Sequence, residues 1–501
     1  MDPHIPQTIQ SQKGKPLLLF KNFIYHHHDF NKDRSRRYWR CSQRKICNAS
    51  ITTNNNLDAI QILRDGSGKH LHAADPAEVK VRTLTENVKK RARDEPNERP
   101  SDVLTAVVGV PPEEVAQKLP ERRAMKRMVN RTQASRRPPN PKTIRDLVIT
   151  APYDRTLRGD PFLLFDSGQE DADRLLIFTT DESLRVLAMC DIVFSDGTFK
   201  TVPGAFAQLF SIHGKYMGFV FPLVFALTMR LTEDTYRVVY EKVKERCVQL
   251  RLRLDRENLT FMMDFELANM NAVRRVFPQA TVRGCLFHFD QTIWRRVVEA
   301  GLKTEYETVD SPVRRDVVTL MALPFVPLDD LVEVFEEITE DMDPRLDDIV
   351  TNLETNYVKG VQRRRRLIAP RFGPEVWNTY EATLGGEQRT NNAVEGWHNH
   401  LQLFMVVRHP SIWRFLENLR KEENTVFTQI TQVRGGHTQI REPVNKKYRT
   451  NQRQVEAIVD NYATFKEEGN VAGYLRAIGY HLKSGAAPEA PVAVDSDDND
   501  L

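Results

Sequence analysis

Cysteine is scarce in this sequence, with five in 501 residues. So few thiols exclude the disulfide framework of small secreted proteins and favour a reducing compartment. Long apolar runs are also missing. The longest, residues 217–227, contains Pro222 and is shorter than the roughly 20 apolar residues that a membrane-spanning helix needs. Because the N-terminus is polar and has no signal-peptide core, we expect a soluble intracellular protein.

An excess of one charge is missing as well, since the formal net charge is only +4. The basic residues are instead concentrated locally. Residues 121–137 carry seven basic side chains and one acid, with Met125, Met128 and Val129 as a narrow apolar face. Such a helix can remain solvated, but its composition favours contact with DNA. The residues that we expect to contact DNA here are Arg122, Arg123, Lys126, Arg127 and Arg131.

Shifts in composition along the chain divide it into segments. We expect a polar arm over 1–15, a β-rich module over 16–75, a linker over 76–100, a basic helical segment over 101–140, an α/β core over 147–302, an all-helical insertion over 303–385, the last part of the core over 386–435, closing helices over 436–482 and a disordered acidic tail over 483–501.

The β-rich module is too small for its hydrophobic core alone to stabilise it, so it needs an additional cross-link such as a bound metal ion. Cys41, Cys47 and the pair His70 and His72 supply two thiolates and two imidazoles, the ligands of a closed tetrahedral zinc site. The alternative is two incidental cysteines and a surface histidine pair. Nearby, a basic group could meet DNA phosphates or remain solvated. It includes Arg36, Arg37 and Arg40.

The order of aromatic residues and ligands in this module resembles the FLYWCH zinc finger. The matching residues are Phe20, Tyr25, Tyr38, Trp39, Cys41, Cys47, His70 and His72. The match covers most of residues 16–73. It implies one structural zinc ion and a role in binding DNA or protein.

In the core, strand patterns cover residues 191–200, 206–212 and 218–227, and a helical pattern covers 232–252. A strand over 259–263, a helix over 267–277 and a strand over 280–282 follow. The order β-β-β-α-β-α-β predicts a ribonuclease H-like mixed sheet. Asp196 lies in the first strand and Asp264 ends the fourth, so we expect the two carboxylates side by side.

Adjacent carboxylates repel one another unless cations lie between them, so this pair indicates a divalent metal site. Two-metal phosphoryl transfer also needs a third acid, and Glu395 after the insertion can supply it. Simpler roles are open for both: Asp264 could cap the following helix, and Glu395 could complete a capping box with Asn392.

Four motifs in this half resemble the catalytic domain of Mutator-like (MULE) transposases. They are Asp196-Gly-Thr-Phe, Asp264-Phe-Glu, Cys285-x-x-His288 and Asn391-Asn392-x-x-Glu395-Gly-Trp-His, in the family's order over roughly residues 190–420. The resemblance implies that Asp196, Asp264 and Glu395 bind two Mg²⁺ or Mn²⁺ ions. Cys285 and His288 match a family motif; we expect them to support the site or bind a structural ion, with core packing as the alternative.

The leading hypothesis is therefore a nuclear DNA transposase that cleaves and joins DNA, bound as a homo-oligomer to the terminal repeats of a transposable element. Lys89-Lys90-Arg91-x-Arg93 is typical of a nuclear localisation signal. Two alternatives are a domesticated transposase that regulates transcription or chromatin without catalysis, and a ribonuclease H-type nuclease without strand transfer.

Overall fold

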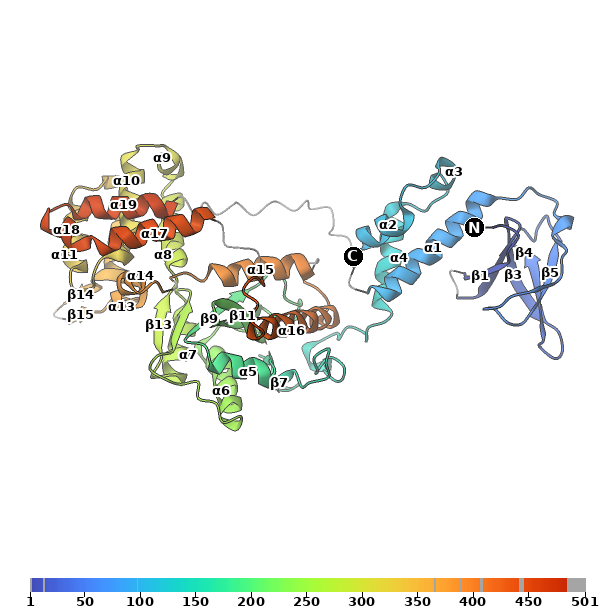
Figure 1. Ribbon diagram of the computed structural model, residues 1–501, viewed down its shortest axis with the longest axis horizontal. Helices are drawn as coiled ribbons and strands as arrows, with labels where there is room; N and C mark the ends of the chain where they lie inside the picture. Colours follow the sequence, from blue (N-terminus) through green and yellow to red (C-terminus); the bar gives the residue numbers. More distant parts are fainter. Residues whose placement is uncertain are drawn as a thin grey trace. The chain divides into compact units, whose positions relative to one another are not determined.

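The computed structural model describes residues 2–11, 14–96, 98–364, 366–387, 389–405, 409–440 and 446–483. The chain divides into two compact units, Met1–Asn140 and Pro141–Leu501 (Figure 1). All but the first residue of the expected acidic tail lies outside the described residues. A search of the described helices finds none with the length and apolar character that crossing a membrane requires.

The first unit begins with a six-stranded antiparallel meander, β1 to β6 in sequence order. Its strands alternate between core and solvent, as β4 illustrates: Trp39 and Cys41 are buried, whereas Arg36, Tyr38 and Arg40 are exposed. Residues 1–15, which we expected to form a polar arm, include a strand, because residues 7–10 pair with β2 as strand β1. The strands are β1 (Gln7–Gln10), β2 (Pro16–Phe20), β3 (Phe23–Phe30), β4 (Arg36–Cys41), β5 (Ser50–Asn54) and β6 (Ile62–Arg64).

A helical bundle completes this unit, and it includes residues that we expected to form a linker. Residues 76–94 are helix α1, which begins after the N-cap Asp75. Val81, Val88 and Ala92 form a buried stripe among the charges and pack toward the neighbouring helices. The helices are α1 (Pro76–Asp94), α2 (Pro100–Val108), α3 (Glu113–Ala116) and α4 (Arg122–Ala134).

The second unit is built on a seven-stranded mixed sheet with strand order β13-β12-β9-β10-β11-β8-β7. Strands β9 to β11, where strand patterns were expected, form an antiparallel meander, and β12 joins β9 and β13 in parallel. The expected order of strands and helices is present, and β7 and β8 extend the far edge. The strands are β7 (Leu163–Asp166), β8 (Leu176–Phe178), β9 (Ile192–Thr198), β10 (Gln208–Tyr216), β11 (Phe219–Thr228), β12 (Thr260–Met263) and β13 (Thr281–Gly284).

Helices cover both faces of this sheet (Figure 1). Helices α5, α6 and α7 pack on the face that carries Val193, while α15 and α16 pack on the other face. Phe194 and Met262 point to the α15 side, where they contact Val394. The helices are α5 (Asp181–Ala188), α6 (Glu233–Gln249), α7 (Leu267–Val276), α8 (Leu286–Glu299), α15 (Asn392–Met405) and α16 (Ile412–Arg434).

The segment between α8 and α15 is mostly helical, but it is not all-helical as we expected. It contains a two-stranded hairpin, β14–β15, preceded by a π-helical turn, Glu354–Val358. The C-terminal helices pack on this insertion: Tyr474 donates a hydrogen bond to the carbonyl of Phe325, 2.5 Å away. The elements are α9 (Lys303–Glu307), α10 (Pro312–Met321), α11 (Leu331–Glu340), α12 (Asp347–Leu353), β14 (Val361–Arg363), β15 (Arg366–Ile368), α13 (Pro374–Trp377), α14 (Tyr380–Leu384), α17 (Lys446–Asp460), α18 (Tyr462–Glu467) and α19 (Val471–Lys483).

Arg174 is buried near the start of the second unit, where it holds residues 144–147 in place. Its guanidinium binds both carboxylate oxygens of Asp166, at 2.8 and 2.6 Å, and donates to the carbonyls of Ile144 and Leu147. Arg174→Met leaves these acceptors without a partner, so we expect the second unit to lose about 3 kcal/mol of unfolding free energy in a denaturant titration. Arg230→Met is the matched control, because its pair with Asp173 is solvent-exposed and its loss should change little. Equal losses of unfolding free energy in the two variants would contradict this stabilising role of Arg174.

Candidate active site and metal centre

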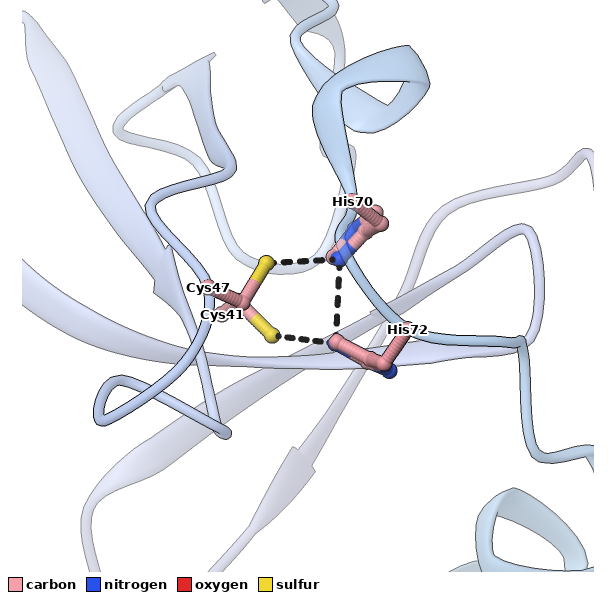
Figure 2. Close-up of side chains that lie close together, drawn as sticks. All are labelled: Cys41, Cys47, His70 and His72. Atoms are coloured by element: carbon pink, nitrogen blue, oxygen red, sulfur yellow. Dashed lines mark hydrogen bonds between the residues drawn. The ribbon is translucent and has the colours of Figure 1, made fainter.

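Two thiols and two imidazoles meet between β4 and the end of the meander (Figure 2). Cys41 Sγ lies 3.1 Å from His72 Nε2, Cys47 Sγ lies 3.2 Å from His70 Nδ1, and the two histidine nitrogens are 3.2 Å apart. A tetrahedral zinc ion would separate such N–S and N–N pairs by about 3.5 and 3.3 Å. The donor set and its spacing therefore fit a structural zinc ion.

Surrounding groups set which nitrogen of each histidine faces the thiols. His70 Nε2 hydrogen-bonds the hydroxyl of buried Tyr25 at 2.8 Å, and His72 Nδ1 bonds the carbonyl of Ala73 at 2.9 Å. Phe23 stacks on the His70 ring with centroids 3.6 Å apart. Burial, followed by the charge of His72, lowers the pKa of His70. The ring is thereby kept neutral, which is the form that binds metal.

A second group of polar residues gathers at the carboxyl end of β12. Met263 pairs with Ser195, so the next residues, Asp264 and Asp196, lie side by side on adjacent parallel strands. Both residues continue the strand alternation of Met262 and Phe194, which places their side chains on the α15 face. The structure thus brings together two of the three acids that the sequence indicated.

Glu395 reaches the same place from the first turn of α15. The helix begins at Asn392, so Asn392 lies inside it and not at the preceding cap position. His288 links the acids: its Nδ1 lies 2.7 Å from Asp264 Oδ1, and its Nε2 lies 3.1 Å from Glu395 Oε1. The imidazole ring therefore lies between these two carboxylates.

The electrostatics of this group reflect its crowding with acids. Burial and the negative charge of Asp264 raise the pKa of Asp196 to about 8. Burial opposes protonation of His288, but its contacts with Asp264, Cys285 and Glu395 outweigh it and raise its pKa to about 12. A cationic imidazole therefore partly compensates the carboxylates of Asp264 and Glu395.

The acids offer the oxygen donors that Mg²⁺ and Mn²⁺ prefer, and Asp264 Oδ1 is buried without an aligned hydrogen bond. Their chemistry fits divalent cations. Among the described residues, however, only Cys41, Cys47, His70 and His72 form a group of three or more metal-binding side chains whose ligand atoms all lie within 4.8 Å of one another. Binding of an ion shared by Asp264 and Glu395 would require the His288 ring to move aside.

His398 ends the motif that contains Glu395, but no role for it was predicted from the sequence. Its Nδ1 lies 3.4 Å from Asp196 Oδ2, and its Nε2 lies 3.3 Å from the hydroxyl of Ser211. Burial lowers the pKa of His398 to about 4, against the opposing charge of Asp264. A neutral imidazole therefore supports Asp196. The i, i+3 spacing from Glu395 was the available signal, because it places both side chains on one helix face.

Cys285 fixes the returning chain before α15. Its Sγ accepts a hydrogen bond from the backbone N–H of Asn391 at 3.2 Å, and the N–H of Leu286 donates to the carbonyl of Arg389 at 3.1 Å. These two bonds connect the Cys285-x-x-His288 segment to the residues just before α15. The contact of His288 with Glu395 adds a third connection, to the acid itself. Support of the site by Cys285 and His288 stays a prediction.

Gly284, next to Cys285, makes room for Phe265, which follows Asp264. A Cβ at position 284 would lie 2.5 Å from the Phe265 ring, an impossible separation. Gly284→Ala should displace the ring and cost about 2 kcal/mol of stability, measured by thermal unfolding. The control is Gly204→Ala, since Gly204 is exposed and no atom lies within 4 Å of its Cβ position. An unshifted unfolding midpoint in Gly284→Ala would exclude this packing role.

The basic residues that we expected to contact DNA differ in their availability. Arg36 and Arg40 are exposed on β4, whereas Arg37 lies over the Phe30 ring and hydrogen-bonds Asn55. The set on α4 is largely exposed, while the apolar residues of α4 are buried in the bundle. Arg122, Arg127 and Arg131 have no ion pair with any described residue, whereas Arg123 and Lys126 do make intramolecular interactions.

Two family models match parts of the chain. The family model of the FLYWCH zinc finger domain matches residues 8–72, and that of the MULE transposase domain matches residues 192–292. The first match spans the meander and all four zinc-ligand candidates, and the second spans Asp196, Asp264 and His288. No curated protein matches the chain. Together the two domains indicate a transposase-derived DNA-binding protein with a zinc finger.

Proposed function

From a chain in which a FLYWCH zinc finger precedes a MULE transposase domain, we propose a metal-dependent DNA transposase with a ribonuclease H-like core. One observation carries the proposal. Asp196, Asp264 and Glu395 come from β9, the end of β12 and α15, and contacts through His288 and His398 gather them at one edge of the sheet. Elements so distant in sequence have no evident structural need to bring three acids together.

Each residue has a distinct task in this proposal. The three acids would hold two divalent cations, which activate the attacking hydroxyl and stabilise the leaving oxygen. Asp264 and Glu395 are about one-third exposed, with side-chain exposures of 37% and 32%, so a DNA phosphate can approach them. Cys285 and His288 would position Glu395, and His398 would position Asp196.

The first unit would hold the DNA. Arg36 and Arg40 on the finger, and the basic side chains of α4, would contact phosphates at the ends of a mobile element. A dimer or larger homo-oligomer would then join two ends in the nucleus. The segment proposed as a nuclear localisation signal lies in helix α1, where Lys89, Arg91 and Arg93 pair with glutamates. To act as a nuclear localisation signal, these residues would have to be recognised in helical form. Otherwise a different segment would have to serve as the signal.

The position of the His288 ring favours one alternative, a regulator that binds DNA without cleaving it. In that protein the imidazole would remain between Asp264 and Glu395, and the site would serve only to hold α15 against the sheet.

Incubation of the zinc-loaded full chain with DNA carrying candidate terminal repeats separates the two functions. A transposase should yield cut and joined products with added Mg²⁺ or Mn²⁺ and none when no divalent cation is added to the zinc-loaded chain. Binding to the repeats without products under any divalent cation would favour the regulator.

A further inference from the structure

The hairpin β14–β15 carries a cluster of arginines that the proposed catalytic centre does not use. Arg363, Arg364, Arg366 and Arg371 are all exposed, and Leu367 and Ile368 on β15 are exposed by 62% and 43%. Position 365 lies outside the described residues. We call Arg363, Arg364 and Arg366 the hairpin arginines.

None of the hairpin arginines has an ion pair or side-chain hydrogen bond with any part of the chain that the structure describes. Several other basic residues of the insertion are instead paired with acids. Lys359, just before the hairpin, lies 2.7 Å from Glu336 and 2.9 Å from Glu354, and Arg345 binds Asp343 at 2.7 Å. The hairpin therefore presents concentrated, uncompensated positive charge to an external partner.

The root of the hairpin is rigid. The buried indole of Trp377 donates to the carbonyls of Tyr357 and Phe372, which flank the hairpin in sequence, at 3.1 and 3.2 Å. The N–H of Phe372 also donates to the carbonyl of Asn356 at 2.8 Å. At its entry, Gly360 has a φ of +87°, and a Cβ there would lie 2.1 Å from the carbonyl oxygen of Ile368.

This root packs directly against the residues that follow the proposed catalytic ones. Phe265, next to Asp264, contacts the rings of Tyr357 and Phe372, with centroid distances of 5.6 and 5.1 Å. Phe289, next to His288, stacks on Trp377 with centroids 4.8 Å apart. The hairpin is thus fixed to the acid-bearing edge of the sheet through a continuous aromatic cluster.

We propose that the β14–β15 hairpin binds the phosphate backbone of duplex DNA flanking the phosphodiester held at Asp264. Charge complementarity identifies the partner, because a run of unpaired guanidinium groups matches phosphates spaced along a strand. The apolar side chains of Leu367 and Ile368 would lie against the sugar edges. Fixed through the aromatic root, the hairpin sets the direction of the DNA at the centre. The location of this DNA rests on the proposed function, whereas DNA binding by the hairpin does not.

The test uses the zinc-loaded full chain and a mixed-sequence DNA duplex in EDTA-free buffer without divalent cations, so that cleavage plays no part. In the triple variant Arg363→Ala, Arg364→Ala and Arg366→Ala, loss of three phosphate contacts should reduce the slope of log K against log salt by about 2.7. A control of equal charge change removes Arg251, Arg274 and Arg275, which are exposed on and after helices α6 and α7; of these, Arg275 is paired with Glu233. This control should leave the slope unchanged.

A second measurement locates the DNA. All five native cysteines are buried, so a cysteine introduced by Gln362→Cys can be labelled alone with a photocrosslinker. Crosslinks should form to DNA in the wild-type background and decline in the triple variant. An unchanged salt slope together with absent crosslinks would overturn the proposal. So would a triple variant that loses self-association while its DNA affinity is unchanged, because the hairpin would then bind a second copy of the chain. Absence of DNA cleavage by the wild type would refute the proposed function but not these binding results.

Discussion

Asp264→Asn is expected to reduce DNA cleavage by a factor of about 1,000 or more while DNA affinity remains within about twofold of the wild type. The proposed centre needs carboxylates that carry full negative charge on both sides of the scissile phosphate. An amide keeps the size of the side chain but removes the charge, so the cations lose several kcal/mol of their stabilisation of the transition state. The DNA affinity is preserved because the substitution does not alter the finger, α4 or the hairpin, which are the elements proposed to bind DNA. Cleavage is measured on a labelled duplex with Mg²⁺ and with Mn²⁺.

A carboxylate outside the site provides the control for this result. Asp191 immediately precedes β9, at the opposite end from Asp196, and pairs with Arg256 at 3.1 Å. Asp191→Asn should therefore retain full cleavage. Glu395→Gln should behave like Asp264→Asn, since both acids contact His288. Cleavage that survives in Asp264→Asn would remove this acid from the mechanism and with it the proposed two-cation centre.

Loss of the zinc ion should unfold the finger and leave the second unit intact. The finger buries only a small hydrophobic cluster around Tyr25, Trp39 and Ile51. This cluster is too small to stabilise a six-stranded sheet without a bound metal ion. Structural zinc sites contribute about 10–16 kcal/mol of apparent binding free energy, and this energy is coupled to folding. Chelation or Cys47→Ser should therefore abolish one calorimetric transition and preserve that of residues 141–501. It should also weaken DNA binding strongly.

Cys247→Ser is the control, because Cys247 is buried in α6 of the second unit. It should keep one zinc ion per chain and leave the finger's transition in place. Trp39 is the tryptophan of the first unit, so replacing it by Phe identifies the fluorescence change that belongs to the finger. A Cys47→Ser chain that binds one zinc ion and retains both transitions would refute the ligand assignment.

The sequence predicted the parts of the fold that depend on local patterns. Short apolar runs identified β9 to β11, and the helical pattern over 232–252 identified α6, which Thr232 caps with its hydroxyl accepting from the N–H of Thr235. The charge-dense stretch 76–94 was misassigned because its apolar stripe is narrow and diluted by ion-paired residues. β1 was missed because strand pairing with β2, and not its polar composition, defines it. The hairpin β14–β15 was missed since each strand has only three residues.

The candidate site was predictable where strand order alone sets proximity. Asp196 and Asp264 follow from the parallel pairing of β9 with β12. Glu395 was indicated by the need for a third acid and by the motif resemblance. The place of His288 between two acids and that of His398 beside Asp196 could not be predicted. Both depend on how α8 and α15 dock on the sheet, which is determined by contacts such as that of Cys285 with Asn391 and not by any local pattern.

Glu395 joins the other acids only because the chain returns to the sheet after the long insertion. A chain that ends early, within residues 303–385, would contain the finger, the helical bundle and two of the acids. Under the proposed function, such a chain would keep the DNA-binding elements of the first unit but lack the complete group of acids, so shortened copies would compete with the intact protein for its DNA ends without cutting them.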